Sequence, residues 1–142
     1  MTEKISLIPP LQSNNDQGFV VSTTDARDAY QVFDGSTSTG YRSTISPHFP
    51  EYLTITFPKE YVIDSYRVYL DYNRYWRMRE WEFQGLVNGE WITLNEGMCL
   101  THDFVTLYFE FEPVLVSGVR IKCLSVDGNN SWGIGELEVY EY

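Results

Sequence analysis

The sequence is poor in several chemically important kinds of residue. Its 142 residues include two cysteines, two histidines and ten lysines and arginines, against twenty aspartates and glutamates, so the formal net charge is −10. A phosphate-binding surface needs basic residues, and the negative charge therefore argues against nucleic acid as a partner. For the same reason, insertion into or attachment to an anionic membrane is disfavoured. The charge either keeps the protein soluble, which is the simpler interpretation, or contributes to a cation site.

Long hydrophobic segments are also absent. No apolar run approaches the roughly 20 residues that a membrane-spanning helix requires. Residues 1–18 are polar and include Pro9-Pro10, so they do not resemble a secretory signal peptide. We therefore expect production in the cytoplasm, followed by retention there or by another exit route, such as assembly into a virus particle. An extracellular surface or a virus particle is the expected place of action.

Recognisable catalytic motifs are lacking. Neither His48 nor His102 has a nearby serine or cysteine in a known nucleophile motif. The sequence contains no P-loop, no glycine-rich dinucleotide turn and no metalloprotease helix motif. Asp103 and Glu110 are close only along the chain, whereas glycoside hydrolysis needs two carboxyl groups placed in a cleft. We therefore expect a protein that is not an enzyme.

The two cysteines, Cys99 and Cys123, are predicted to be buried free thiols, since cysteine is among the most frequently buried residue types. A disulfide between them is the alternative. The sequence alone does not give the separation that a disulfide requires.

Strand-forming patterns are abundant. A hydrophobic content of 43% and an aromatic content of 16% are typical of a single globular domain. Asn88-Gly89 lies between strand-like segments 81–84 and 90–94 and predicts a tight hairpin, because both residues tolerate positive φ. A last strand is predicted at 136–140 and one helical turn within 25–33. Apolar and polar residues alternate, as in strands buried on one face, in segments 53–57, 66–70, 105–109 and 119–123.

About seven or eight such strands, joined by turn residues, predict an all-β fold, namely an antiparallel β-sandwich of the jelly-roll type. Residues 1–17 are rich in proline, asparagine and serine, and we predict that they form an N-terminal arm or docking tail. Residues 18–142 are predicted to form the sandwich domain.

A loop rich in oxygen atoms follows the predicted helical turn. Residues 34–41 contain two glycines, which allow tight turns. Calcium takes six to eight oxygen ligands, and one loop rarely supplies them all. Glu136 can add a carboxylate, because a sandwich brings its first and last strands together. The alternative is that the loop aspartate caps a turn and Glu136 is a solvated strand residue. The candidate ligands in the loop are Asp34, Ser36 and Thr39.

Basic and aromatic residues are concentrated in residues 71–79. Three of the ten basic residues lie there, with two tyrosines and a tryptophan. An aromatic face packs on the C–H face of a sugar ring, while asparagine and arginine bond its hydroxyls, and a guanidinium also suits carboxylates. An anionic sugar would therefore gain an ion pair. The alternative is that the arginines pair with local acids and the rings face the core, as we expect for Trp81. The candidate ligand contacts are Asn73, Arg74, Tyr75, Trp76 and Arg77.

Two motifs at opposite ends of the chain resemble one protein family. Residues 29–41 read AYQVFDGSTSTGY, and residues 132–140 read WGIGELEVY. Their order and spacing, with the Trp91 hairpin between them, resemble the discoidin or coagulation factor 5/8 type C domain family, which overlaps the family 32 carbohydrate-binding modules. The resemblance extends from Ser13 to Tyr142. It implies a galactose-binding-like β-sandwich that binds sugars, other surface groups or proteins and has no catalytic activity.

The resemblance also implies roles for particular residues. In the family, the acidic residue of the first motif and the glutamate of the last strand hold a structural calcium ion, which implies Ca²⁺ at Asp34, Ser36, Thr39 and Glu136. Many family members lack the metal. Members place ligand contacts in the loop equivalent to 71–79 and in two further segments. Tyr41 stands where a tryptophan is common. Trp132 suits both a stacking platform and a core residue. The further implied contacts are Arg42, His48, Asn130 and Trp132.

The predicted function is a non-catalytic carbohydrate-binding and adhesion module that recognises cell-surface glycans through loop aromatics and arginines. The opening segments IPPL and SNN are similar to those of discoidin modules on phage tail and capsid proteins, which implies host attachment. The alternative is a structural or protein-interaction module of a virus particle, a decoration, tail or baseplate component, whose partners are other virion or surface proteins. A concave site with Arg74, Trp76 and Trp132 favours the first function, and burial of these residues between subunits favours the second.

Overall fold

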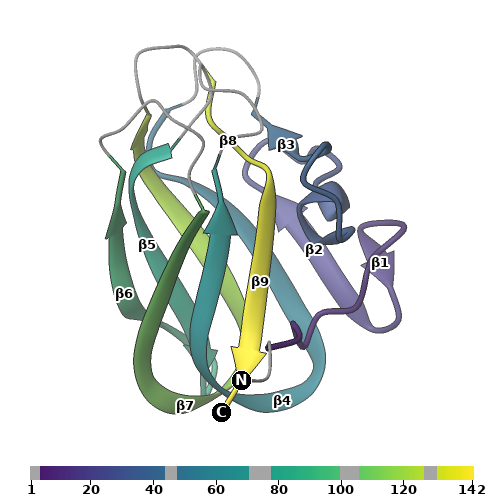
Figure 1. Ribbon diagram of the computed structural model, residues 1–142, viewed down its shortest axis with the longest axis vertical. Helices are drawn as coiled ribbons and strands as arrows, with labels where there is room; N and C mark the ends of the chain where they lie inside the picture. Colours follow the sequence, from purple (N-terminus) through teal and green to yellow (C-terminus); the bar gives the residue numbers. More distant parts are fainter. Residues whose placement is uncertain (1–3, 44–47, 71–77, 100–105, 127–130) are drawn as a thin grey trace.

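The computed structural model describes residues 4–43, 48–70, 78–99, 106–126 and 131–142. Most of these residues lie in strands, which confirms the predicted all-β fold (Figure 1). Within these ranges no helix is long and apolar enough to cross a membrane. In chain order the elements are β1 (Asn15–Asp16), β2 (Phe19–Thr23), the 3-10 helix η1 (Tyr30–Phe33), β3 (Tyr41–Arg42), β4 (Glu51–Tyr69), β5 (Met78–Val87), β6 (Glu90–Met98), β7 (Thr106–Val126), β8 (Gly133–Ile134) and β9 (Glu136–Glu141).

Strands β4 and β7 form one long antiparallel pair that contributes to both layers of the sandwich. Two register shifts interrupt the pairing, one between Thr56 and Tyr61 of β4 and one between Ile63 and Ser65 of β4, where the extra residues lie on β7. Such irregularities bend a strand and increase its twist. The pair therefore folds over near these shifts, and its two halves lie in different layers (Figure 1).

The two layers share these long strands. The larger layer has the strand order β1-β2-β4-β7-β5-β6 and uses the first half of β4. The second half of β4, with β7 on one side and β9 on the other, forms a three-stranded layer. β3 and β8 make a separate short pair beside the layers. Each of these pairings is antiparallel, which confirms the predicted antiparallel sandwich.

The sequence predicted four short strands where the structure has two long ones. The predicted strands 53–57 and 66–70 fall on β4 or at its end, and those at 105–109 and 119–123 fall on β7 within the described residues. Residues 58–60, at the bend of β4, are exposed and interrupt the apolar-polar alternation. Alternation of apolar and polar residues therefore predicts the two straight halves of each long strand, but it does not show that the halves belong to one continuous strand.

The β5–β6 hairpin is formed as predicted. Val87 pairs with Glu90, so the loop has two residues, Asn88 and Gly89. Their φ angles are 51° and 81°, as a tight turn that matches the strand twist requires.

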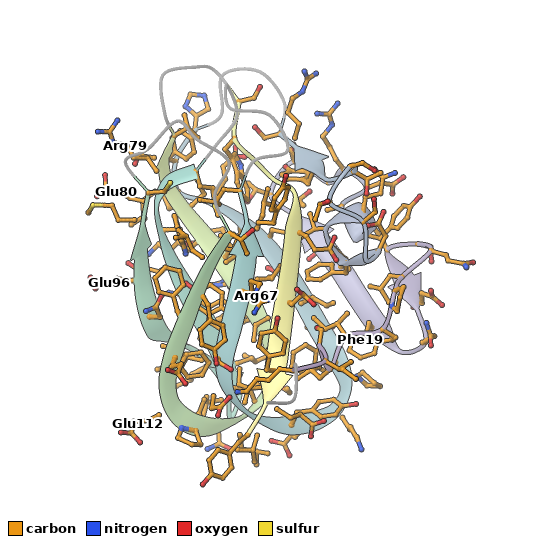
Figure 2. All side chains as sticks on the ribbon, viewed as in Figure 1. Phe19, Arg67, Arg79, Glu80, Glu96 and Glu112 are labelled. Atoms are coloured by element: carbon orange, nitrogen blue, oxygen red, sulfur yellow. The ribbon has the colours of Figure 1, made fainter. Side chains whose placement is uncertain are left out.

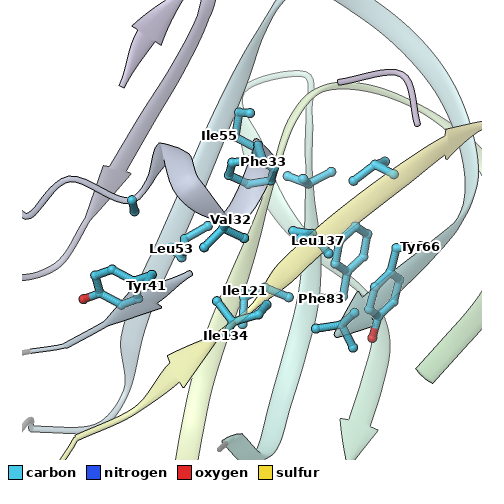
Figure 3. Packing of buried hydrophobic residues seen from close by; sticks show 14 of the residues in the cluster. Val32, Phe33, Tyr41, Leu53, Ile55, Tyr66, Phe83, Ile121, Ile134 and Leu137 are labelled. Atoms are coloured by element: carbon cyan, nitrogen blue, oxygen red, sulfur yellow. The ribbon is translucent and has the colours of Figure 1, made fainter. Parts of the chain in front are cut away.

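The core lies between the two layers and is joined across them by aromatic side chains (Figure 3). Tyr66 of the three-stranded layer stacks on Phe83 of the larger layer, with ring centroids 3.9 Å apart. Its hydroxyl accepts the indole N–H of Trp81 at 3.0 Å and donates to Oδ1 of Asn95 at 2.6 Å. A Cβ at Gly97 would lie 2.0 Å from Cε2 of Trp81, so glycine there leaves room for the indole. Trp81 is buried, as the sequence predicted.

The described part of the predicted N-terminal arm or docking tail is packed on the sandwich. Ile8 and Leu11 are 6% and 2% exposed. The N–H of Leu7 donates to the carbonyl of Val139 at 2.8 Å, and the N–H of Leu11 donates to the carbonyl of Phe33 at 2.9 Å. The prediction rested on proline, asparagine and serine, and the structure adds the apolar anchors Ile8 and Leu11. The unpaired edge of β9 supplies the backbone partner that this segment needs.

Both cysteines are free and buried, as predicted. Burial raises the pKa of the Cys123 thiol above its ordinary range. The thiol of Cys123 donates weakly to the carbonyl of Ser125, with 3.6 Å between sulfur and oxygen. Such a thiol behaves as a small apolar core residue.

Candidate functional site

The oxygen-rich loop begins directly after η1, and later residues of the loop form hydrogen bonds to its first residue, Asp34. Asp34 Oδ1 accepts the N–H of Ser36 at 2.9 Å, and Oδ2 accepts the hydroxyl of Thr39 at 2.6 Å. Gly35 has a φ of 80°, which a residue without a side chain adopts easily. The loop is thereby held in a compact form with three of the predicted calcium ligands together.

Glu136, at the start of β9, completes this group from the far end of the chain. Its Oε2 accepts the N–H of Gly35 at 2.9 Å, across 101 positions of sequence. The side chain is 9% exposed, so Glu136 is not the solvated strand residue of the alternative interpretation. Its Oε1 is buried and has no hydrogen-bond partner among the described residues. The structure thus brings all four predicted calcium ligands to one place.

The environment of Glu136 disfavours an isolated negative charge. Burial, and then the neighbouring carboxylates of Asp34 and Glu138, raise the pKa of Glu136 to about 9, against the opposing hydrogen bond from Gly35. A buried carboxylate with one unsatisfied oxygen is costly unless a proton or a cation compensates it. The side-chain atoms that could bind a metal ion here are all oxygens, which suits calcium. No group of three or more histidine, cysteine or acidic residues suited to a metal occurs in the described ranges, so hydroxyl and main-chain oxygens would have to complete the shell.

The strand ends that flank the predicted ligand loops meet at one end of the sandwich, which we call the apical end (Figure 1). Register places Tyr69 beside Thr106, Met78 beside Val126 and Met98 beside Glu80 at this end. Segments 71–77 and 127–130 continue from these strand ends. The predicted ligand residues within those segments lie outside the described residues: Asn73, Arg74, Tyr75, Trp76, Arg77 and Asn130.

Two other predicted ligand residues are accessible. Arg42 is exposed at the end of β3, and its carbonyl accepts an Nη1 hydrogen bond from the exposed Arg27 at 2.9 Å. His48 is also exposed. Arg79, the third arginine of the predicted ligand segment, is exposed at the start of β5 (Figure 2). The exposed guanidinium groups toward this end are those of Arg27, Arg42 and Arg79, although the chain as a whole is acidic.

Trp132 is a core residue, the second of the two roles that the sequence allowed, and its place among the implied ligand contacts is corrected. Its side chain is 0% exposed and packs edge-on against Tyr41, with ring centroids 5.3 Å apart. Its indole N–H donates to Oε1 of Glu51 at 2.8 Å, and its backbone N–H donates to the hydroxyl of Ser43 at 2.9 Å. The ring thus supports the apical end from beneath and offers no face to a sugar.

Two acidic residues that the sequence did not single out support the same region. Glu51 is buried and holds Trp132, while Asp25 accepts the hydroxyl of Tyr41 at 2.8 Å and that of Thr23 at 2.6 Å. Burial and the nearby Asp25 raise the pKa of Tyr41 above its ordinary range. No local pattern marks these acids, because the contact of Glu51 with Trp132 spans 81 positions of sequence and that of Asp25 with Tyr41 spans 16.

A groove of about 510 Å³ runs between the packed N-terminal segment and β9. Residues 4–10 form one side, and Phe33, Gly35 and residues 136–138 form the other. The groove adjoins the oxygen-rich loop at Gly35.

Comparisons with known proteins agree with this architecture. A family model for the F5/8 type C domain matches residues 13–137. A sequence comparison with curated proteins found no match. Among solved structures, the family 32 carbohydrate-binding module of Clostridium perfringens NanJ, in complex with galactose, is 19% identical with a TM-score of 0.78. The match covers 91% of this chain and 98% of that one.

Two further structures have the same fold. CpGH89CBM32-5 from Clostridium perfringens, in complex with GalNAc-β-1,3-galactose, is 14% identical with a TM-score of 0.76, and the match covers 91% of this chain and 99% of that one. The family 32 module of AlyQ, in complex with 4,5-unsaturated mannuronic acid, is 16% identical with a TM-score of 0.70, with coverage of 85% and 93%. Because the family model spans nearly the whole chain and the fold agrees with it, the chain belongs to the F5/8 type C domain family.

Proposed function

We propose that this protein is a non-catalytic module that binds cell-surface carbohydrate at its apical end. The observation that carries the proposal is the convergence of strand ends there. Arg79 at the start of β5, Arg42 at the end of β3 and His48 before β4 are exposed. The three solved modules described above are in complex with galactose, GalNAc-β-1,3-galactose and 4,5-unsaturated mannuronic acid. We expect the function at an extracellular surface or on a virus particle, where such glycans are met.

The residues proposed to contact the sugar lie in the segments that these strand ends flank. Because Trp132 is buried, stacking falls to Tyr75 and Trp76. Arg74 and Arg77 supply guanidinium donors, together with the amides of Asn73 and Asn130 and the exposed Arg42 and His48. Guanidinium groups bind paired oxygens, so a sugar with a carboxylate, such as a sialic or uronic acid, gains an ion pair at this end.

The test is a glycan-array screen of the purified protein in calcium buffer, followed by affinity measurements for each hit. We expect selective binding that weakens about tenfold or more in Arg74→Ala and Trp76→Ala, because each loses a direct contact. Arg120→Ala is the matched control. This arginine lies on the outer face of the larger layer, with its guanidinium 4.3 Å from the Tyr52 ring centroid and 4.4 Å from that of Trp91. The control should bind as the wild type does.

We also propose that Asp34, Ser36, Thr39 and Glu136 hold a structural Ca²⁺. The buried, unpartnered Oε1 of Glu136 and the adjacent carboxylate of Asp34 support this, since both gain from a cation. Bound calcium would supply charge compensation and a fixed link between the loop and β9. It takes no part in sugar binding in this proposal.

A further inference from the structure

A small pocket lies on the outer face of the three-stranded layer and reaches the apical end at Tyr69 and Thr106. Of the residues proposed to contact sugar at the apical end, the described ones, Arg42 and His48, do not line it. Its volume is about 180 Å³, which corresponds to roughly six water molecules at about 30 Å³ each and leaves room for one sugar ring. The residues that line it come from the oxygen-rich loop and from all three strands of the layer: Thr37, Arg67, Tyr69, Thr106, Glu136 and Glu138.

Strand register explains why these side chains share one face. On β4, Tyr66 and Val68 are 0% exposed and point into the core, so the alternating Arg67 and Tyr69 point outward. Arg67 lies opposite Glu138 of β9, and Tyr69 lies opposite Glu136. Across the other edge of β4, the partners are Tyr108 for Arg67 and Thr106 for Tyr69. The register therefore places the guanidinium of Arg67 between the ring of Tyr108 on one side and the carboxylate of Glu138 on the other.

The guanidinium of Arg67, labelled in Figure 2, is held by ring contacts and is not neutralised by an ion pair within the described residues. It lies 5.9 Å from the ring centroids of both Tyr108 and Tyr140, which hold it by cation–π contact. The ion pair found among the described residues joins Lys4 and Asp64. Within the same residues Arg67 forms neither an ion pair nor a hydrogen bond, although Glu138 is its neighbour on β9. Its N–H donors therefore remain open to a ligand and lose little freedom on binding.

Acceptors and further hydroxyls complete the lining. Glu138 is half-buried, and its carboxylate can accept from a ligand, while one oxygen of Glu136 already accepts the N–H of Gly35. Thr37, Tyr69 and Thr106 add hydroxyls. The guanidinium of Arg67 supplies a fork of hydrogen-bond donors, and the carboxylate of Glu138 beside it is an acceptor. This pair suits two adjacent hydroxyl groups of a sugar, because each hydroxyl both donates and accepts a hydrogen bond. Glu138 lies opposite Arg67 in the same lining, so a negatively charged ligand meets a carboxylate there and is disfavoured against a neutral one.

We propose that this pocket is a second carbohydrate subsite, which takes one neutral sugar residue through adjacent hydroxyls. Arg67 donates to the hydroxyl oxygens and Glu138 accepts a hydroxyl hydrogen. The subsite is independent of the apical contacts, so each site binds whether or not the other is intact. With two subsites the module can engage two residues of a dense glycan surface, and the linkage increases overall avidity.

The test is a titration of ¹⁵N-labelled full-length protein followed by NMR, with galactose, N-acetylgalactosamine and glucuronic acid as probes. We expect saturable shifts of the amides of residues 67–69 and 136–138 with at least one neutral sugar, with a millimolar Kd and weaker binding of glucuronic acid. Arg67→Ala and the near-isosteric Glu138→Gln should each weaken the response of these amides about tenfold or more. Arg120→Ala, which also removes an arginine held between rings, should leave it unchanged.

The double variant Arg74→Ala/Trp76→Ala separates this subsite from the apical one. We expect it to keep the shifts of residues 67–69 and 136–138 even where apical binding is lost. The proposal is overturned if the folded wild type shows no saturable shift of these amides with any of the three sugars. It is also overturned if both pocket variants respond as the wild type does, or if glucuronic acid binds there as tightly as the neutral sugars.

Discussion

At the scale of single residues, buried polar pairs explain why certain side chains are where they are. Trp132 lies in the core with its N–H on Glu51, and Tyr66 joins Trp81 to Asn95. A buried polar group without its partner costs about 1–3 kcal/mol. These pairs therefore fix one arrangement of the aromatic core beneath the apical end.

Trp132→Phe should lower the free energy of unfolding by about 1–3 kcal/mol, because it leaves the buried Glu51 carboxylate without its N–H partner. Chemical denaturation measures this loss. Glycan affinity of the folded variant should stay at the wild-type value, since the ring has no exposed face. Unchanged stability combined with lost glycan binding would show that Trp132 is a ligand platform after all.

At the scale of elements, the sequence predicted what depends on local pattern and failed where distant segments meet. The hairpin could be predicted from Asn88-Gly89, because the positive φ angles that the turn requires are confined to these two residues. The continuity of β4 and β7 was missed, since the polar bend at 58–60 separates two regular halves. The contact of Glu136 with the loop after Asp34 was anticipated from the family resemblance, but its burial was not, because burial depends on packing that no local pattern reports.

The packed N-terminal segment gives a prediction at this scale. Leu11→Ala should lower the free energy of unfolding by about 2–5 kcal/mol, as expected for truncation of a fully buried leucine. Ile5→Ala, in the same segment but 89% exposed, is the control and should change it by no more than about 0.5 kcal/mol. Equal, small effects in a denaturation experiment would mean that residues 4–11 are a loose arm in solution.

The loop after η1 and β9 should share a dependence on pH and calcium. In EDTA, the pKa of Glu136 in the folded protein is raised to about 9, above the value of about 4.3 for an unfolded glutamate. A proton is therefore bound more tightly in the folded state. The stabilising contribution is complete below about pH 4.3 and is lost as the pH rises through about 9.

Melting temperatures between pH 5 and 9 test this dependence. In EDTA the wild type should lose more stability with rising pH than Glu136→Gln, whose amide stays neutral and can still accept from Gly35. Calcium should reduce the loss in the wild type, since a bound cation compensates the carboxylate. If EDTA and calcium give the same melting curves and elemental analysis detects no metal, the calcium proposal is wrong.

At the scale of the whole molecule, charge and topology divide the protein into two ends. The chain carries a net charge of −10, yet Arg27, Arg42 and Arg79 are exposed toward the apical end. Residues 4 and 142 lie at the opposite end, where the N–H of Tyr142 donates to the carbonyl of Val62 at 2.9 Å (Figure 1). A neighbour attached at either terminus would therefore leave the apical end free to bind a surface.

The most direct test of carbohydrate binding at the apical end compares the wild type with Arg74→Ala/Trp76→Ala on one glycan array, in calcium buffer, after circular dichroism has shown both to be folded. We predict selective binding of the wild type to a defined glycan class and loss of most of that signal in the double variant. A blank array for the folded wild type, or a double variant that binds as strongly, would contradict the account. A blank would instead favour a structural or protein-binding role, such as that of a virion component.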